Sequence, residues 1–222
     1  MTQENFALVV LGGQLADEAS ASEFASNANL ILCADSGAEH ARKLGLPVDA
    51  IVGDLDSTTP ETLRFFEEKK NPRCEIIKIP EQEYNDFEKT LDYLSERWNG
   101  AVHILGMTGG RADHTLSNFS VMLRCADRFT SLEAYDGSSV HSFLTTKRNH
   151  RSIECSTGTT ISLMPFGEAA GVTTKNLRYT LSNETLRLGA REGLSNISTG
   201  SPVIVSIESG ALLISVHDLP KT

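Results

Sequence analysis

Acidic side chains follow several apolar runs of the sequence, at the point where each run ends. Asp35 comes directly after one apolar run, and Asp54 and Asp56 follow the next. Asp86 and Asp113 follow later runs, each within a longer polar motif. Carboxylates that crowd together repel one another unless a cation joins them. Because hard carboxylate oxygens suit Mg²⁺, which also binds phosphate oxygens, the pattern indicates a magnesium-dependent site for a phosphate compound.

Basic residues accompany these acids. Lys89 lies three residues after Asp86, so a helix would place both side chains at the same edge of the sheet. Arg111 follows the diglycine Gly109-Gly110 at an expected helix start, where free N–H groups and a guanidinium both favour phosphate. His114 is the one histidine that lies in so dense a motif. These residues strengthen the interpretation as a phosphate site.

Each of these features also has an ordinary structural interpretation. An Asp after a strand is commonly a helix cap or a turn residue, and Asp35-Ser36-Gly37 fits that role. Gly12-Gly13 after the first apolar run is a weak hint of a phosphate loop. The sequence has no P-loop, dinucleotide-binding or nucleophile-elbow motif. The recurrence of acids at successive run ends favours ligand binding.

The elements that must position these residues alternate between two periodicities over the first 136 residues. The apolar runs that predict buried strands are Phe6–Leu11, Leu30–Ala34, Ala50–Val52, Glu75–Ile79, Ala101–Leu105 and Leu132–Tyr135. Helical spacing of apolar residues marks Asp86–Trp98 and Arg111–Asp127, and Pro60 suits the first turn of a third helix. The alternation predicts a parallel α/β sheet with right-handed crossovers. The acids then lie at the carboxyl ends of its strands, where such sheets bind ligands.

The pattern changes after Asp136-Gly137-Ser138-Ser139. The later apolar runs are short and separated by Gly, Asn, Ser and Pro: Val140–Thr145, Ser152–Glu154, Thr159–Met164, Gly171–Thr174, Asn196–Ser198, Pro202–Ser209 and Ala211–Val216. Short strands at this spacing are typical of an antiparallel sandwich or barrel. We therefore expect an α/β domain over residues 1–137 and an antiparallel β domain over residues 138–222.

Composition excludes some classes of partner. The chain has 20 Lys and Arg against 29 Asp and Glu, a formal net charge of −9, which disfavours nucleic acid and anionic membranes. No apolar run approaches the roughly 18 residues of a membrane span. The four cysteines are too far apart in sequence for a zinc or redox motif, so free thiols are expected. These features predict a cytoplasmic protein.

Taken in order, the motifs resemble those of the thiamine pyrophosphokinase (thiamine diphosphokinase) family. The matching stretches are Ala34–Gly37, Gly53–Ser57, Asn85–Leu91, Gly109–His114 with Asn118, and Gly193–Asn196. The resemblance implies an N-terminal α/β catalytic domain, a C-terminal β-sandwich that helps to bind thiamine, and a homodimer with sites between subunits. It also implies transfer of the diphosphoryl group of ATP to the hydroxyl of thiamine, which releases AMP.

The resemblance suggests a role for each motif residue. Asp54, Asp56 and Asp86 would hold Mg²⁺, and Lys89 and Arg111 would neutralise charge on the phosphates; these five form the expected catalytic set. The expected ATP-binding residues are Asp35, Ser36, Gly37, Ser57, Lys89, Arg111 and His114. The expected thiamine-binding residues are Asp113, Ser195 and Asn196, for the last two of which a plain β-turn is an equal alternative.

The chain departs from the family pattern just before Asp86. Members often carry Asp and Thr where this chain has Glu83 and Asn85. Glu83 is therefore a weaker candidate ligand, and Asn85 keeps a polar side chain without the hydroxyl. Two other functions stay open from the sequence: a diphosphotransferase for a different alcohol such as a pterin, and a non-catalytic nucleotide or vitamin sensor.

Overall fold

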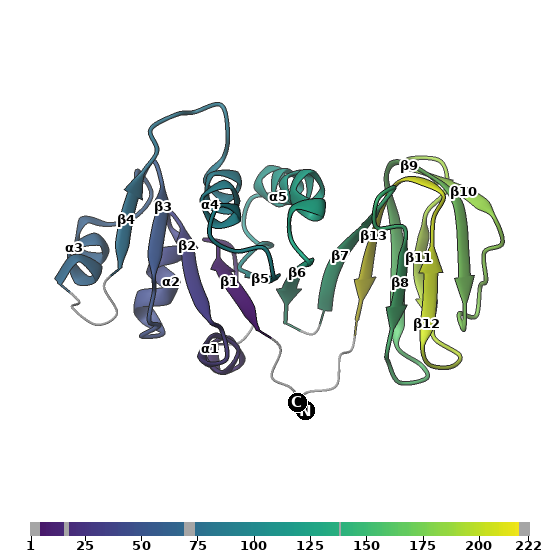
Figure 1. Ribbon diagram of the computed structural model, residues 1–222. Coiled ribbons are helices and arrows are strands. Elements are labelled where there is room, and N and C mark those ends of the chain that lie inside the picture. The colour runs from purple at the N-terminus through teal and green to yellow at the C-terminus, as the bar shows by residue number, and fades with distance from the viewer. Residues whose placement is uncertain (1–4, 16–17, 69–73, 138, 218–222) are drawn as a thin grey trace. The chain divides into compact units, whose positions relative to one another are not determined.

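The chain forms two compact units in a computed structural model that describes residues 5–15, 18–68, 74–137 and 139–217. The first unit spans Met1–Gly137 and the second Ser138–Thr222, and each is considered by itself (Figure 1). Ser138, in the segment where the domain boundary is expected, lies outside the described residues.

The first unit is built on one parallel sheet. Its strands are β1 (Phe6–Val10), β2 (Leu30–Ala34), β3 (Ala50–Gly53), β4 (Glu75–Lys78), β5 (Ala101–Leu105) and β6 (Ser131–Asp136). They pair in the order β4-β3-β2-β1-β5-β6, and every pair is parallel. The predicted parallel sheet is confirmed. Continuous apolar runs are the sequence pattern of strands that are covered on both faces.

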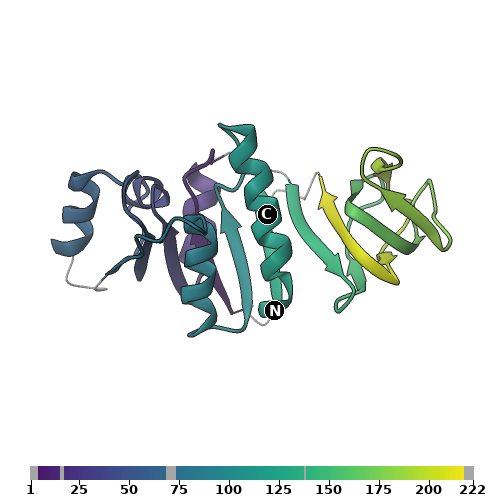
Figure 2. The same cartoon turned by 90° about the horizontal axis from the view of Figure 1, so that it is seen from above.

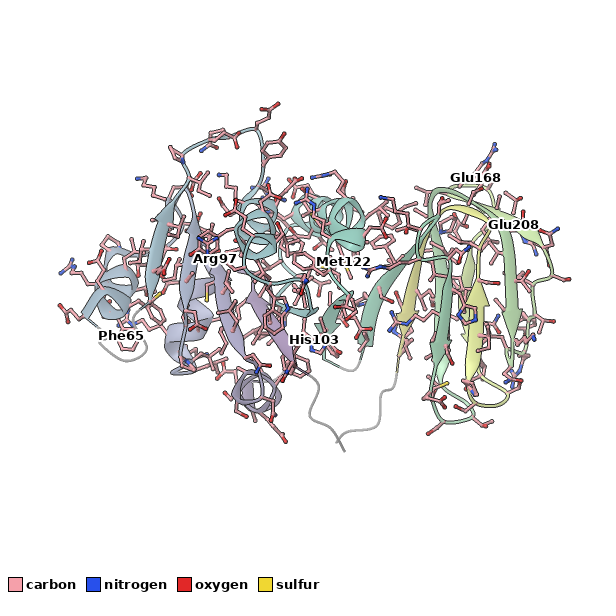
Figure 3. All side chains as sticks on the ribbon, viewed as in Figure 1. Phe65, Arg97, His103, Met122, Glu168 and Glu208 are labelled. Carbon is pink, nitrogen blue, oxygen red and sulfur yellow. The ribbon has the colours of Figure 1, made fainter. Side chains whose placement is uncertain are left out.

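Helices cover the two faces of this sheet. They are α1 (Glu18–Ser26), α2 (Gly37–Lys43), α3 (Pro60–Glu68), α4 (Asp86–Ser95) and α5 (Ala112–Cys125), with a short 3₁₀ turn, η1, at Ala126–Arg128. Contacts join α2 to β1, β2 and α3, whereas α4 packs on β2, β3 and α5. Figure 2 shows α4 and α5 side by side, and Met122 of α5 is fully buried (Figure 3).

The second unit is an antiparallel β structure. Its strands are β7 (Ser139–Thr145), β8 (His150–Ile153), β9 (Thr160–Lys175), β10 (Glu184–Arg187), β11 (Gly193–Ile197), β12 (Val203–Ser206) and β13 (Ser209–Val216). Strand β9 pairs with β13, β10 and β11 in one sheet and with β12 in another, so a single strand belongs to both sheets. A core of aliphatic side chains that includes Ile161, Leu163 and Leu212 is buried within the unit. The predicted antiparallel sandwich class is confirmed.

The second unit differs from the sequence prediction in two details. The runs Thr159–Met164 and Gly171–Thr174 are parts of the single strand β9 and not separate strands. Strand β10 was not expected from the sequence, because its four residues show no apolar run. Neither difference changes the fold class.

The position of a ligand site follows from the strand order of the first unit. Successive strands run outward from β1 to β4 on one side, and β5 then returns to the other side of β1. The loops after β1 and β5 are joined by main-chain hydrogen bonds from Gly13 N to Gly106 O (2.9 Å) and from Gln14 N to Thr108 O (2.7 Å). Sheets of this kind bind ligands at such a reversal, outside the carboxyl ends of the strands.

Two further expectations from the sequence concern membrane-spanning segments and the state of the cysteines. Within the part of the chain that the structure describes, none of the helices combines the length and apolar character required to span a membrane. All four cysteines are free thiols, as expected, and Cys33, Cys74 and Cys125 are buried.

Candidate functional site

A cavity of about 520 Å³ opens at the carboxyl ends of β1 and β5. Six of the residues expected to bind ATP or metal line it: Asp35, Ser36, Ser57, Asp86, Arg111 and His114. The lining also includes residues that the sequence reasoning did not assign: Leu11, Gln14, Asn85, Phe87, Met107 and Asn118. The diglycine Gly12-Gly13, which also lines the cavity, was the one sequence signal for the β1 loop. The cavity therefore gathers loops that are far apart in the sequence.

Three carboxylates beside the cavity lie close enough to share a cation. Asp35, Asp54 and Asp56 each offer an oxygen, and these oxygens all lie within 4.8 Å of one another. This acid cluster differs from the expected ligand trio, because it contains Asp35 where the sequence reasoning placed Asp86. Hard oxygen donors at this spacing fit Mg²⁺.

Asp35 is the buried member of the acid cluster. Thr58 donates its hydroxyl proton to Asp35 Oδ1 (2.5 Å), and the Ser57 N–H donates to Asp35 Oδ2 (3.2 Å). Burial raises the pKa of Asp35, and the Asp86 and Asp54 charges raise it further, whereas the two hydrogen bonds lower it. A cation next to this carboxylate would offset both the burial and the repulsion.

Asp54 is held by a residue that the sequence reasoning did not assign. Gln82 donates an amide proton to Asp54 Oδ2 (2.8 Å), and the Asp56 N–H donates to Asp54 Oδ1 (3.1 Å). The Gln82 bond is the main cause that holds the pKa of Asp54 below its ordinary value. Glu83, the weaker ligand candidate, is exposed, and the structure shows no hydrogen bond from it to the acid cluster.

Asp86 contacts both the buried ammonium of Lys89 and the main chain of Asp54 in the acid cluster. Lys89 Nζ lies 3.1 Å from Asp86 Oδ1, and the same oxygen accepts a hydrogen bond from the Asp54 N–H (3.1 Å). A Cβ added at Gly53 would lie 3.0 Å from this oxygen and from Asp35 Cβ, which explains why glycine stands there. The predicted proximity of Asp86 and Lys89 at one edge of the sheet is what the structure shows.

Asn85 has a definite structural function. It is the N-cap of α4, and its side-chain oxygen accepts a hydrogen bond from the Glu88 N–H (2.9 Å). Asn caps helices at least as well as the Thr that family members often carry there. The departure from the family pattern therefore preserves the helix start that positions Asp86 and Lys89.

Arg111 and Asp113 form an ion pair with each other. Arg111 Nη2 lies 2.5 Å from Asp113 Oδ2, and Nε lies 3.1 Å from Oδ1, so the contact is bidentate. Both side chains are exposed, and of the two only Arg111 lines the cavity. The guanidinium lowers the pKa of Asp113 to about 2. In this pair the Arg111 guanidinium uses two of its donors on Asp113, so an anion that enters the cavity would compete with Asp113 for them.

The ion pair with Arg111 should change the titration of the Asp113 carboxyl measurably. Because the pKa of Asp113 is lowered in the folded protein, the pairing is present above about pH 4 and is lost as the pH falls through about 2. We expect ¹³C NMR of the Asp113 carboxyl to titrate near pH 2, and Arg111→Gln to return it towards the ordinary value of about 3.9. Arg97→Gln, a change at an exposed Arg elsewhere in the unit, is the control. An unchanged Asp113 titration in Arg111→Gln would contradict the pairing.

The two expected thiamine residues of the second unit differ in exposure. Ser195 is exposed and has a positive φ of 53°. Asn196 is buried, and its amide accepts a hydrogen bond from the Tyr179 N–H (3.0 Å) and donates one to the Tyr179 carbonyl (2.7 Å). Asn196 thus fixes the segment that carries the exposed side chain of Tyr179.

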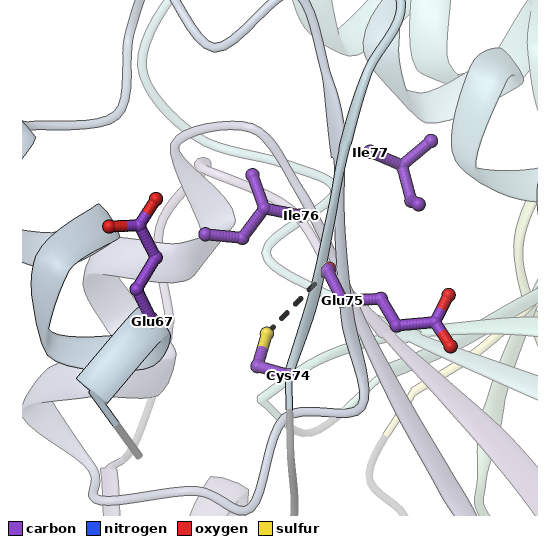
Figure 4. A pocket seen from close by; sticks show the side chains of 5 residues that line it. All are labelled: Glu67, Cys74, Glu75, Ile76 and Ile77. Carbon is purple, nitrogen blue, oxygen red and sulfur yellow. Dashed lines mark hydrogen bonds between the residues drawn. The ribbon is translucent and has the colours of Figure 1, made fainter. Parts of the chain in front are cut away.

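The remaining expected residues lie near the cavity but outside its lining. Gly37 begins α2, Lys89 lies in α4 beside Asp86, and Asp54 and Asp56 lie in the loop after β3. A second cavity, of about 720 Å³, lies beside the edge strand β4, where Ile76 and Ile77 point to opposite sides of the strand (Figure 4). Glu75 there is bound to the Tyr93 hydroxyl (2.7 Å), and the lining resembles a sheet edge more than a built site.

Comparisons with known proteins agree on one family. The family profile described as "Thiamin pyrophosphokinase, catalytic domain" matches residues 21–135, and that described as "Thiamin pyrophosphokinase, vitamin B1 binding domain" matches residues 142–212. Thiamine pyrophosphokinase 1 of Oryza sativa subsp. japonica is 30% identical over 212 residues, which cover 82% of this chain and 76% of that protein. Thiamine pyrophosphokinase of Bacillus subtilis is 27% identical and covers 76% of this chain and 78% of its own length.

Solved structures show the same fold. The crystal structure of thiamine pyrophosphokinase from Bacillus subtilis has a TM-score of 0.81 at 24% identity and covers 97% of this chain and 100% of that chain. Thiamin pyrophosphokinase from Candida albicans also has a TM-score of 0.81, at 16% identity, and covers 98% and 90%. Because the catalytic-domain profile alone spans more than half of the residues, this chain belongs to the thiamin pyrophosphokinase family.

Proposed function

We propose that this chain is a thiamine diphosphokinase, which transfers the diphosphoryl group of ATP to the hydroxyl of thiamine and releases AMP. Family membership supports this activity. The observation that carries the assignment of the site is that Asp35 of the acid cluster lines the same cavity as Arg111 and as Asp86, which pairs with Lys89.

The reaction exchanges one phosphorus–oxygen bond for another. The thiamine hydroxyl oxygen attacks the β-phosphorus of ATP, the bond from that phosphorus to the bridging oxygen of AMP breaks, and the hydroxyl proton is released. Phosphoryl chemistry of this kind asks a protein mainly to hold the reacting groups in line and to neutralise charge. The residues of the site would serve both requirements.

Each of these requirements is met by particular residues. The cavity lined by the β1 and β5 loops would hold ATP, with Asp35, Ser36, Ser57 and His114 among the lining residues that would contact it. Lys89 and Arg111 would stabilise the negative charge that develops on the phosphates. Gly37 would support this site from the start of α2, outside the lining.

The acid cluster fits a divalent cation. Its donors are carboxylate oxygens, and two of the three carboxylates lie at least partly open to solvent. We propose that Asp54, Asp56 and Asp86 hold Mg²⁺, together with Asp35, which the structure places in the same cluster. The bound ion would supply Lewis-acid polarisation and charge neutralisation at the phosphate oxygens. Asp35, Asp54 and Asp86 would otherwise repel an anionic substrate.

The two units would divide the substrates between them. Residues 1–137 would form the ATP- and magnesium-binding catalytic domain, and residues 138–222 would contribute to thiamine binding through Ser195 and Asn196. Asp113 would hold the cationic thiamine or its hydroxyl, in exchange for its contact with Arg111. We also propose that the protein works as a homodimer in the cytoplasm.

A turnover assay tests this function. The full chain is incubated with ATP, Mg²⁺ and thiamine, and the products are separated. We expect thiamine diphosphate and AMP in equal amounts, and no turnover when thiamine or Mg²⁺ is left out. ADP as the product would indicate an ordinary kinase, and AMP release with a pterin in place of thiamine would identify a different acceptor.

A further inference from the structure

Thr58 is a buried polar residue that the proposed mechanism does not use. It lies between β3 and α3 and is 5% exposed. Its hydroxyl donates to Asp35 Oδ1 at 2.5 Å. Asp35, itself 4% exposed, has a positive φ of 39°. A buried hydroxyl that donates to a buried carboxylate in this way fixes the orientation of that carboxylate.

The loop that follows β3 is anchored to Asp35, in addition to the contacts of Asp54 with Asp86 and Gln82. Within this loop, the Asp56 N–H donates to Asp54 Oδ1 and the Ser57 hydroxyl donates to Asp56 Oδ1 (2.8 Å), so its hydrogen bonds link the two carboxylates to each other. The bonds that connect the loop to the neighbouring β2 loop are those from Thr58 and from the Ser57 N–H to Asp35. The position of Asp35 relative to Asp54 and Asp56 therefore depends on these two bonds, of which the contact with the Thr58 hydroxyl is the buried one.

We propose that Thr58 is a positioning residue for the divalent-cation site. Its hydroxyl orients the Asp35 carboxylate and joins it to the loop that carries Asp54 and Asp56, so that the three carboxylate oxygens stay within reach of one ion. The inference rests on the proposed function for its connection to catalysis. Its connection to cation binding is independent of the second substrate.

The experiment compares two variants that differ only in the hydroxyl. Thr58→Ala and Thr58→Ser both remove the γ-methyl group, but Ser keeps the donor hydroxyl. Mn²⁺ binding to the full chain is measured by electron paramagnetic resonance with and without ATP, and the Mg²⁺ dependence of AMP release is measured in parallel. We expect Thr58→Ala to weaken Mn²⁺ binding about tenfold, and Thr58→Ser to stay within about twofold of the wild type.

A matched control separates this role from general stability. Thr62 is also buried, and its hydroxyl donates to a carboxylate, Glu39 Oε2 (2.7 Å), away from the strand ends. Thr62→Ala should lower the melting temperature as Thr58→Ala does, and should leave Mn²⁺ affinity unchanged. If Thr58→Ala does not fold, Thr58→Val, which fills the same volume without a donor, replaces it.

The outcomes distinguish the two proposals. Wild-type Mn²⁺ affinity in folded Thr58→Ala, or an equal loss in Thr58→Ala and Thr58→Ser, overturns the role of the hydroxyl. Failure of the wild type to bind Mn²⁺ with or without ATP overturns it as well. If the wild type binds Mn²⁺ but forms no AMP from ATP and thiamine, the proposed function fails, and the Mn²⁺ comparison still decides the role of Thr58.

Discussion

Asp54→Asn is expected to lower kcat at saturating Mg²⁺ by at least about a hundredfold while the protein stays folded. Asparagine keeps the shape of the side chain and an oxygen that can accept from the Asp56 N–H, but it removes one full charge from the acid cluster. A bound metal contributes several kcal/mol of charge stabilisation in the transition state, and about 3 kcal/mol corresponds to roughly a hundredfold in rate. AMP release at increasing Mg²⁺ measures the effect.

The control is an aspartate of the same unit that lies away from the strand ends. Asp92 is paired with Arg128 on the surface, so Asp92→Asn changes the net charge equally without touching the acid cluster. We expect its kcat to match that of the wild type. Full activity of Asp54→Asn, with its circular dichroism spectrum unchanged, would rule out Asp54 as a metal ligand.

The second large effect is expected from Lys89→Met. The Lys89 side chain is 4% exposed, and its ammonium lies 3.1 Å from Asp86, which is 27% exposed. Removal of the charge leaves Asp86 facing Asp54 and Asp35 without compensation. We expect a loss of about 2 kcal/mol in the free energy of unfolding, less than the roughly 3–5 kcal/mol of a fully buried pair because water reaches Asp86.

The same substitution should also lower kcat by about a hundredfold, since one preorganised positive group at the phosphates is lost. Chemical denaturation with and without Mg²⁺ provides a further test. Added Mg²⁺ should restore part of the lost stability, because the ion replaces the missing positive charge. Lys43→Met, at an exposed pair with Glu18, is the matched control. A stability of Lys89→Met equal to that of this control would contradict the proposed compensation.

The first unit was predictable to a large extent because its strands are uninterrupted apolar runs. Leu30–Ala34 and Ala101–Leu105 have the bounds that the sequence predicts, and the helix at Asp86 begins where expected. Helix α1 was not predicted, because Phe24 is the one large apolar residue that packs on the core from it, beside the small residues Ala21 and Ala25. Small apolar residues give almost no periodic signal.

The second unit was less predictable for a reason that lies in β9. Gly167 and Gly171 have positive φ values of 82° and 67°, and such residues normally mark turns. Here they lie inside one strand, whose pairing with β10 and β13 shifts register in this region. A bulge within a long strand and a turn between two short strands have the same sequence signature.

The residues of the candidate site were also predictable only in part. The motifs brought Asp54, Asp86 and Lys89 to neighbouring strand ends, as the sequence indicates. Asp35 was also expected at this edge of the sheet, but as an ATP-binding residue. Its contact with Thr58 and the contact of Gln82 with Asp54 join residues more than 20 positions apart, which spacing does not reveal. Likewise, only the three-dimensional contacts show that the Asn196 amide binds the main chain of Tyr179.

The main-chain bonds between the β1 and β5 loops have a thermodynamic consequence. Gly13, Gln14, Gly106 and Thr108 already hold one another in place, and His40 Nε2 lies 2.7 Å from the Gly13 carbonyl. Ordering a free backbone costs about 1–2 kcal/mol per residue, and here that cost is met during folding. A ligand that enters the cavity therefore loses little of its binding energy to the ordering of these two loops.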